Sequence, residues 1–183
     1  SSFDGESTKK REEEQLKGMT PSVIIGLGGT GKRVIMQIRK KIVEEHKSLS
    51  NMPILAFLVL DTDEEIVQLA GQESKVLMSS IELQPNEVIH ATITGTQELS
   101  ANLHLYPHIS DWLDPFVLAT GDSSHGARAI RALGRLAFFL NYPIINNAFE
   151  QARHRVSIVD NRPFMEKRGI VVDPGINVYV VGS

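Results

Sequence analysis

Two apolar runs near the start of the chain predict buried strands. Val23-Ile24-Ile25 is a short β-branched run that stops at Gly26, and residues 54–60 (ILAFLVL) are apolar throughout, without alternation. A continuous apolar run of this length is typical of a parallel strand that is covered on both faces. Residues 76–78 and 176–181 provide two further candidate strands.

Apolar residues three or four positions apart predict helices between these strands. In the first helix Val34, Ile38 and Ile42 recur every four residues, with Ile35 beside them, which places them on one helix face. The other predicted helices are a short one over residues 64–70, one over 126–140 and one over 143–156. Alternating helices and apolar strands indicate an α/β fold with three layers, a Rossmann-like parallel sheet with helices on both faces.

Two segments lack this regularity. Residues 79–125 have weak periodicity and are punctuated by prolines and glycines, which predicts an insertion of short helices and loops. Residues 1–18 are polar and mixed in charge, and we expect them to form a flexible arm. Residues 19–183 then make up one domain, which is an ordinary length for a domain with a sizeable core.

Composition narrows the classes of function. The net charge of −3 gives no electrostatic reason to expect a nucleic-acid or an anionic membrane partner. The absence of cysteine excludes disulfides and thiolate metal sites, and it is compatible with a reducing cytoplasm. No apolar run approaches the roughly 20 residues of a membrane-spanning helix. We therefore expect a cytoplasmic protein with no nucleic-acid or membrane partner.

The segment GLGGTGKR, residues 26–33, lies where the first strand gives way to the first helix. Glycines at such a junction let backbone N–H groups approach an anion, and the helix N-terminus adds unpaired donors and a partial positive charge. The candidate phosphate-binding residues are Gly28, Gly29, Thr30, Gly31, Lys32 and Arg33.

Two glycine patterns fit this segment to different degrees. Gly26, Gly28 and Gly31 satisfy the dinucleotide-binding fingerprint, with Asp61 as a loosely spaced acidic partner for the ribose. The P-loop pattern fits less well, because Arg33 stands where a magnesium-binding Ser or Thr is needed. A tight turn without a ligand is the structural alternative.

Polar residues follow the second strand directly. Open α/β sheets bind ligands outside the carboxyl ends of their strands, so Asp61, Thr62 and Asp63 are candidates for contact with a ligand or with magnesium-bound water. The alternative is that Asp63 only caps the following helix. His104 and His108 are four residues apart, but Pro107 lies between them and no third ligand is evident, so no metal site is assigned.

Other side chains are expected to serve the fold. Arg39, Lys40 and Lys41 are interpreted as part of a solvated basic helix face. Arg135 is expected to pack or to form a salt bridge. The aromatic residues Phe138, Phe139 and Tyr142 are expected in the core rather than in a base-stacking surface.

Three motifs in order resemble the tubulin/FtsZ superfamily, and most of all its divergent prokaryotic tubulin-like members. They are the glycine loop VIIGLGGTG, the strand end LVLDTDEE, and GARAIRALGRLA at residues 126–137. The resemblance covers residues 22–78 and 126–183 and leaves the insertion outside. It implies that Gly126, Ala127 and Arg128 lie on the γ-phosphate side of a bound nucleotide.

The resemblance implies a guanine-nucleotide-binding protein that takes GTP or GDP with Mg²⁺. It also implies a bacterial GTPase that assembles into homo-oligomers or filaments when intact. In this superfamily a strand like residues 176–181 leads into the main phosphate loop, which we expect just beyond Ser183. The chain alone is therefore expected to be inactive, and no catalytic residue is assigned.

Three departures from the superfamily pattern concern base and ribose recognition more than phosphate binding. Arg33 and Ile130 stand where FtsZ has asparagine, and Asp61 replaces the asparagine before Thr-Asp. Two other functions stay open. One is a Rossmann-type dinucleotide-binding domain, and the other is a non-hydrolysing tubulin-like scaffold or interaction module.

Overall fold

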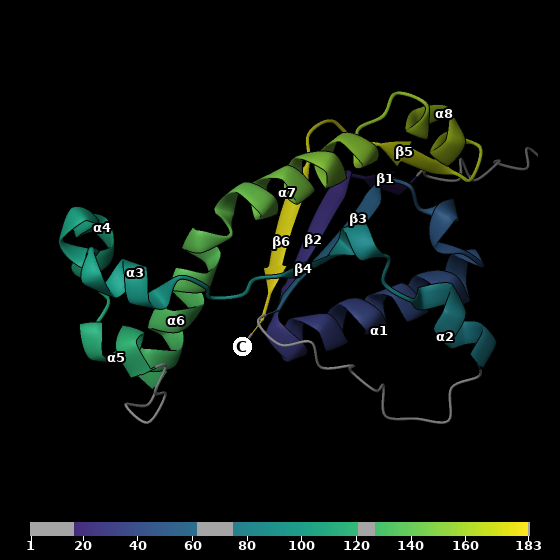
Figure 1. The fold of residues 1–183 in the computed structure, drawn as a ribbon. Helices are drawn as coiled ribbons and strands as arrows, with labels where there is room; N and C mark the ends of the chain where they lie inside the picture. Colours follow the sequence, from purple (N-terminus) through teal and green to yellow (C-terminus); the bar gives the residue numbers. More distant parts are fainter. Residues whose placement is uncertain (1–16, 62–74, 121–126, 183) are drawn as a thin grey trace, which may run out of the picture.

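The fold is described from a computed structural model, over residues 17–61, 75–120 and 127–182. A four-stranded sheet lies at its centre, in the order β4-β3-β2-β6, and every neighbouring pair is parallel (Figure 1). The strands are β2 (Ser22–Leu27), β3 (Leu55–Asp61), β4 (Val88–His90) and β6 (Asn177–Val181). β1 (Lys17–Met19) pairs in parallel with β5 (Ile170–Val172) as a separate small sheet.

Helices cover both faces of the central sheet. α1 (Gly28–His46) packs on one face, where Ile35 and Ile42 meet Phe57 and Val59 in one buried cluster. α7 (Tyr142–Val156) packs on the other face, with Ile145, Ala152 and Val156 against Val23, Leu58 and Leu60. Alternate residues of β3 therefore enter the two clusters, as the period of two in a strand requires. The expected three-layer α/β fold is confirmed.

The remaining helices are short, except for α6 (Ala127–Leu140). They are α2 (Lys75–Ile81), α3 (Thr96–Ala101), α4 (Pro107–Ser110), α5 (Pro115–Thr120) and α8 (Asn161–Glu166), with the 3₁₀ turns η1 (Leu49–Asn51), η2 (Pro85–Glu87) and η3 (Leu103–Leu105). None of the described helices has the length and hydropathy needed to cross a membrane.

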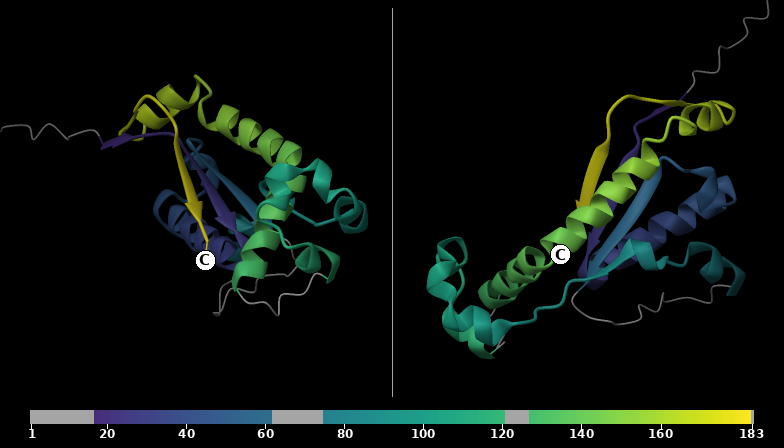
Figure 2. Two further views of the ribbon diagram at one scale, coloured as in Figure 1. Left: turned by 90° about the vertical axis from the view of Figure 1, so that its left-hand side faces the viewer. Right: turned by 45° about the horizontal axis from the view of Figure 1, so that its top comes forward.

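The segment from α3 to α6 forms a helical cluster with its own core. Leu99, Leu103, Ile109, Leu113 and Leu136 are buried together there. In Figures 1 and 2 this cluster lies beyond the end of the sheet toward which the strand arrows point, on the side of α7. The short helices α3, α4 and α5 thus lie within residues 79–125, where short helices were expected, and α6 joins them.

The third strand of the sheet is not where the sequence analysis placed it. Residues 76–78 lie in α2, and the strand next to β3 is β4, inside the segment expected to hold only helices and loops. β4 has only two apolar residues, Val88 and Ile89, before His90, which is a weak strand signal. β1 and β5 were not expected either, and β1 includes Lys17 and Gly18 from the expected arm. The predicted helix over residues 64–70 lies outside the described residues.

Two other expectations about burial are wrong. In α1 Ile35 and Ile42 are buried and Ile38 packs against the same cluster, as expected, while Val34 is 37% exposed and Arg39 is buried. The apolar face is therefore the expected one except at Val34, and it includes a cation that was expected on the solvated face. In the helical cluster Phe138, Phe139 and Tyr142 are 47%, 40% and 53% exposed, because Leu136 and Ala137 take the buried face of α6.

Candidate functional site

The candidate site lies where β2 passes into α1. Leu27 has an extended backbone and is the residue before the helix, and Gly28 opens α1 with φ 63°. The side chain of Leu27, the N-cap residue, makes no hydrogen bond that caps this helix start. The first-turn N–H groups and the positive end of the helix dipole therefore face outward at the carboxyl edge of the sheet.

The glycines of this junction have two different roles. A Cβ on Gly26 would lie 2.7 Å from the backbone of Gly31, and a Cβ on Gly31 would lie 2.6 Å from Gly26, so these two glycines let the helix approach the strand. Gly28 and Gly29 have nothing within 4 Å of a Cβ position. Among the described residues, the side of each backbone that a Cβ would occupy is therefore open. A phosphate cradle requires such free approach to the backbone.

The other predicted residues of the loop lie in the first two turns of α1. Thr30 and Arg33 are exposed, Lys32 is half-buried, and Gly31 is buried against the strand. Gly28, Gly29 and Thr30 are thus the accessible residues of the first turn of α1. The cationic side chains of Lys32 and Arg33 belong to the same end of the helix.

Asp61 lies at the carboxyl end of β3 and is half-buried. It is paired in register with His90 of β4, and its carbonyl oxygen accepts a hydrogen bond of 2.8 Å from the N–H of Ala91. The structure therefore brings the α1 start, Asp61 and the end of β4 to one edge of the sheet. Thr62, Asp63 and Gly126 lie outside the described residues.

Ala127 and Arg128 form the first turn of α6, in the helical cluster. α6 packs mainly on α5 and α7. Arg135, further along α6, places its guanidinium 4.3 Å from the ring centroid of Trp112, which is the packing role expected for it.

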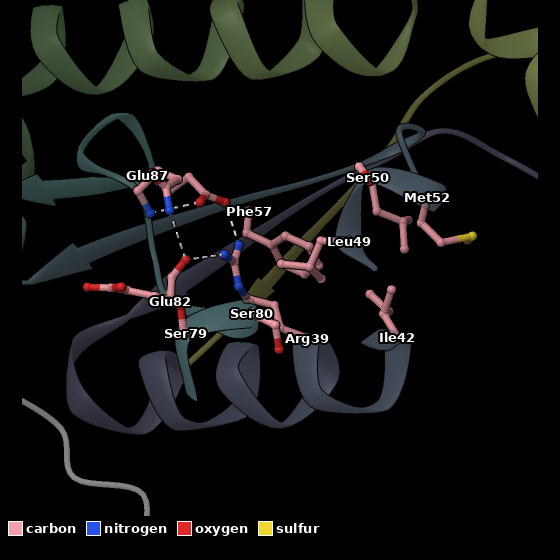
Figure 3. A pocket seen from close by; sticks show the side chains of 12 residues that line it. Arg39, Ile42, Leu49, Ser50, Met52, Phe57, Ser79, Ser80, Glu82 and Glu87 are labelled. Atoms are coloured by element: carbon pink, nitrogen blue, oxygen red, sulfur yellow. Dashed lines mark hydrogen bonds and ion pairs between the residues drawn. The ribbon is translucent and has the colours of Figure 1, made fainter. Parts of the chain in front are cut away.

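Arg39 holds the segment that leads into β4, although the sequence analysis expected this residue on a solvated helix face. Arg39 is only 2% exposed. Its Nε donates to the carbonyl of Ile81 (2.8 Å), one terminal nitrogen donates to Glu87 (2.5 Å) and the other donates to the carbonyl of Glu82 (2.6 Å). A hollow of about 300 Å³ lies beside this cluster, between α1, η1, β3 and residues 79–87 (Figure 3). Arg39 thus ties the segment that leads into β4 to the middle of α1.

A buried amide holds the segment that leaves β4. Asn141 lies between α6 and α7 and is 8% exposed. Its Nδ2 donates to the carbonyl of Thr92 (2.8 Å) and to that of Ala137 (2.7 Å). β4 is therefore fixed on both sides, by Arg39 before it and by Asn141 after it.

Sequence reasoning missed His90 and its strand. The signal that could have found them is the polar residue at the end of VIH, in the same position relative to its strand as Asp61. Arg39 could have been found from helical spacing, since it lies four residues from Ile35 and three from Ile42.

The comparison with known proteins agrees with this geometry. A family model described as tubulin like matches residues 23–183. The match includes residues 79–125, which the resemblance in the sequence left outside, so this segment is part of the family's domain. No curated protein and no solved structure matches the chain significantly. Strand order, the glycine junction and the family match lead to one conclusion: the chain belongs to the tubulin-like family.

Proposed function

We propose that this chain is the nucleotide-binding part of a tubulin-like protein and binds GTP or GDP at the carboxyl edge of the central sheet. The observation that carries the proposal is the open space at Gly28 and Gly29, at a helix start whose N-cap residue, Leu27, makes no side-chain capping hydrogen bond. Backbone N–H groups and the helix dipole stabilise a phosphate there. Lys32 and Arg33 add positive charge nearby.

Asp61 supplies the carboxylate for a magnesium ion that accompanies the phosphates. Magnesium in nucleotide sites keeps several waters and takes few protein oxygens, so one half-buried carboxylate near the phosphates suits it. Thr62 and Asp63 follow in the chain and extend this set. Gly126, Ala127 and Arg128 are proposed for the γ-phosphate side, on the resemblance of GARAIRALGRLA to the family's third loop.

We propose that the intact protein hydrolyses GTP and assembles with copies of itself in a bacterial cytoplasm, as the tubulin-like family implies. A non-hydrolysing scaffold is the second candidate, and it keeps nucleotide binding without turnover. The dinucleotide-binding domain is the third. It finds support in the tight approach of Gly26 and Gly31, which a dinucleotide fingerprint also requires.

Nucleotide competition tests the proposal. A fluorescent GDP is titrated with the natural full-length protein, and unlabelled GTP, ATP and NAD compete for it. Displacement by GTP and GDP, but not by ATP or NAD, supports the guanine-nucleotide site. Displacement by NAD supports the dinucleotide alternative, and failure to bind the fluorescent GDP contradicts the proposal.

Turnover of bound GTP separates the first two candidates. Phosphate release that rises with protein concentration indicates a GTPase that acts between assembled subunits. Tight GTP binding without phosphate release at any concentration indicates the scaffold.

A further inference from the structure

We propose that a pocket at the amino edge of the central sheet binds a free amino acid with an apolar side chain. The pocket has a volume of about 300 Å³ and lies between two loops, residues 156–162 after α7 and residues 172–176 before β6 (Figures 1 and 2). Because the strands of the sheet are parallel, this edge is opposite to the one that carries Gly28 and Asp61. The inference therefore does not depend on the proposed nucleotide binding.

Hydrogen bonds hold both loops in place. Asn161 is 9% exposed, and its Nδ2 donates to the carbonyl of Arg155 (2.9 Å) and to that of Val156 (3.2 Å), across the turn from α7 to α8. On the other side of the pocket, the N–H of Asp173 donates to the carbonyl of Met19 in β1 (2.8 Å). The shape of the pocket is thus fixed before a ligand arrives, and little of the binding free energy is spent on ordering its walls.

The lining of the pocket is mostly apolar. It includes Val156, Ile158, Val172, Pro174 and Ile176. Pockets for small ligands combine such walls with a few polar groups and have volumes of about 300–1,000 Å³. This pocket is at the lower end of that range, so it suits a ligand with one short aliphatic or aromatic side chain and is too small for a nucleotide.

Two opposite charges in the lining have no partner within the described parts of the chain. The carboxylate of Asp173 is half-buried and the guanidinium of Arg162 is exposed, and neither forms a side-chain hydrogen bond or an ion pair with a described residue. A carboxylate that is partly removed from water gains from an incoming cationic donor. A guanidinium binds a carboxylate through two parallel N–H groups.

These features together match the chemistry of a free α-amino acid. The ligand carboxylate would pair with Arg162, the ligand ammonium would pair with Asp173, and the apolar side chain would fill the space between the loops. A fatty acid, an amine or glycine offers only part of this set. A residue inside a peptide lacks both charges, because its amino and carboxyl groups are in peptide bonds.

Titration calorimetry of the natural full-length protein with L-leucine tests the proposal. We expect binding with a Kd of about 0.1–1 mM, as a ligand with so few heavy atoms allows. Isopentylamine lacks the carboxylate of leucine, isocaproate lacks the ammonium and glycine lacks the side chain. Each should bind at least about tenfold more weakly, because each loses a charged hydrogen bond or the apolar contact. No binding of leucine, or equal binding of leucine and these analogues, overturns the inference.

Arg162→Gln and Asp173→Asn locate the site. Each is expected to lower leucine affinity about tenfold or more, which corresponds to the loss of a charged hydrogen bond. Lys167→Gln and Asp160→Asn are the matched controls, since both residues are exposed and neither lines the pocket. Both controls should bind leucine as the wild type does.

Unchanged leucine affinity in Arg162→Gln would overturn the inference, and this variant keeps the test valid because the exposed Arg162 side chain is not needed for folding. GTP affinity is measured on the same variants and is expected to match the wild type. A protein that binds leucine and no nucleotide would contradict the proposed function alone, and a protein that binds GTP and no leucine would contradict this inference alone.

Discussion

Gly26 and Gly31 approach each other so closely that neither position has room for a side chain. A Cβ on Gly31 would lie 2.6 Å from the carbonyl carbon of Gly26 and 2.6 Å from the carbonyl oxygen of Val181. Backbone atoms of β2, α1 and β6 meet at this point. The first turn of α1 is therefore positioned against two strands, and its open face at Gly28 and Gly29 is fixed relative to the sheet.

Gly31→Ala is expected to destabilise the protein. The methyl group must push the helix away from the strand, and overpacking of this kind costs about 1–3 kcal/mol of unfolding free energy. Gly29→Ala is the matched control, because its methyl group meets nothing within 4 Å. Urea unfolding of both variants checks the prediction. Equal unfolding midpoints for the two variants contradict it.

Arg39→Met is expected to lower the unfolding free energy by about 3 kcal/mol, because the change leaves a largely buried carboxylate at Glu87 and two carbonyl groups without their donor. Arg153→Met is the control. It removes an ion pair with Glu150 in which both side chains are about half exposed, and such pairs contribute little. Thermal melts of the two variants separate the effects. A control that melts as early as Arg39→Met would show that the buried pair has no special role.

Asn141→Ala is expected to cost about 1–3 kcal/mol, because the carbonyl of Thr92 loses a buried donor. Hydrogen exchange of the amides that follow β4 should also become faster. Asn102→Ala is the matched control, since its amide donates to the carbonyl of Glu98 at an exposed position. Unchanged exchange after β4 in Asn141→Ala would mean that this amide does not hold the segment.

Phe138→Ser is expected to cost only about 1 kcal/mol, because Phe138 is 47% exposed and the change removes one edge contact with the ring of Tyr142. Leu136→Ala, two residues earlier, removes a fully buried side chain and should cost about 2–5 kcal/mol. Chemical unfolding of the pair measures the difference. A large loss in Phe138→Ser would place that ring in the core, as the sequence analysis expected.

The central strands and the glycine junction could be predicted from the sequence because they carry strong local signals. The seven apolar residues at 54–60 and the β-branched run at 23–25 have few alternatives to a buried strand. Gly26 to Gly31 follow directly, so a strand-to-helix turn was readable as well. These signals depend on neighbours in the chain and not on distant contacts.

The third strand could not be predicted in the same way. β4 has three residues, and it is a strand because β3 offers hydrogen bonds and because Arg39 and Asn141 hold the segments beside it. Residues 76–78 have a stronger local strand signal and yet form a helix. The sequence analysis missed β4 and with it His90. The site predicted from the sequence therefore did not include the carboxyl end of this strand.

Which apolar residues of α6 are buried also depends on tertiary contacts. Phe138 and Phe139 look like core residues by hydrophobicity, but α6 buries Leu136 and Ala137 instead. Residues 136–140 of α6 are apolar without interruption, so the sequence there offers more than one candidate for the buried face. The packing of α5 and α7 selects among them.

The affinity of Gly29→Val for GTP is the most direct test of where the nucleotide binds. Gly29 has open space around its Cβ position, so a valine side chain fits the folded protein and projects into the proposed phosphate cradle. A protein that melts like the wild type and no longer binds GTP is the expected result. Wild-type affinity in a folded Gly29→Val protein would contradict phosphate binding at the start of α1.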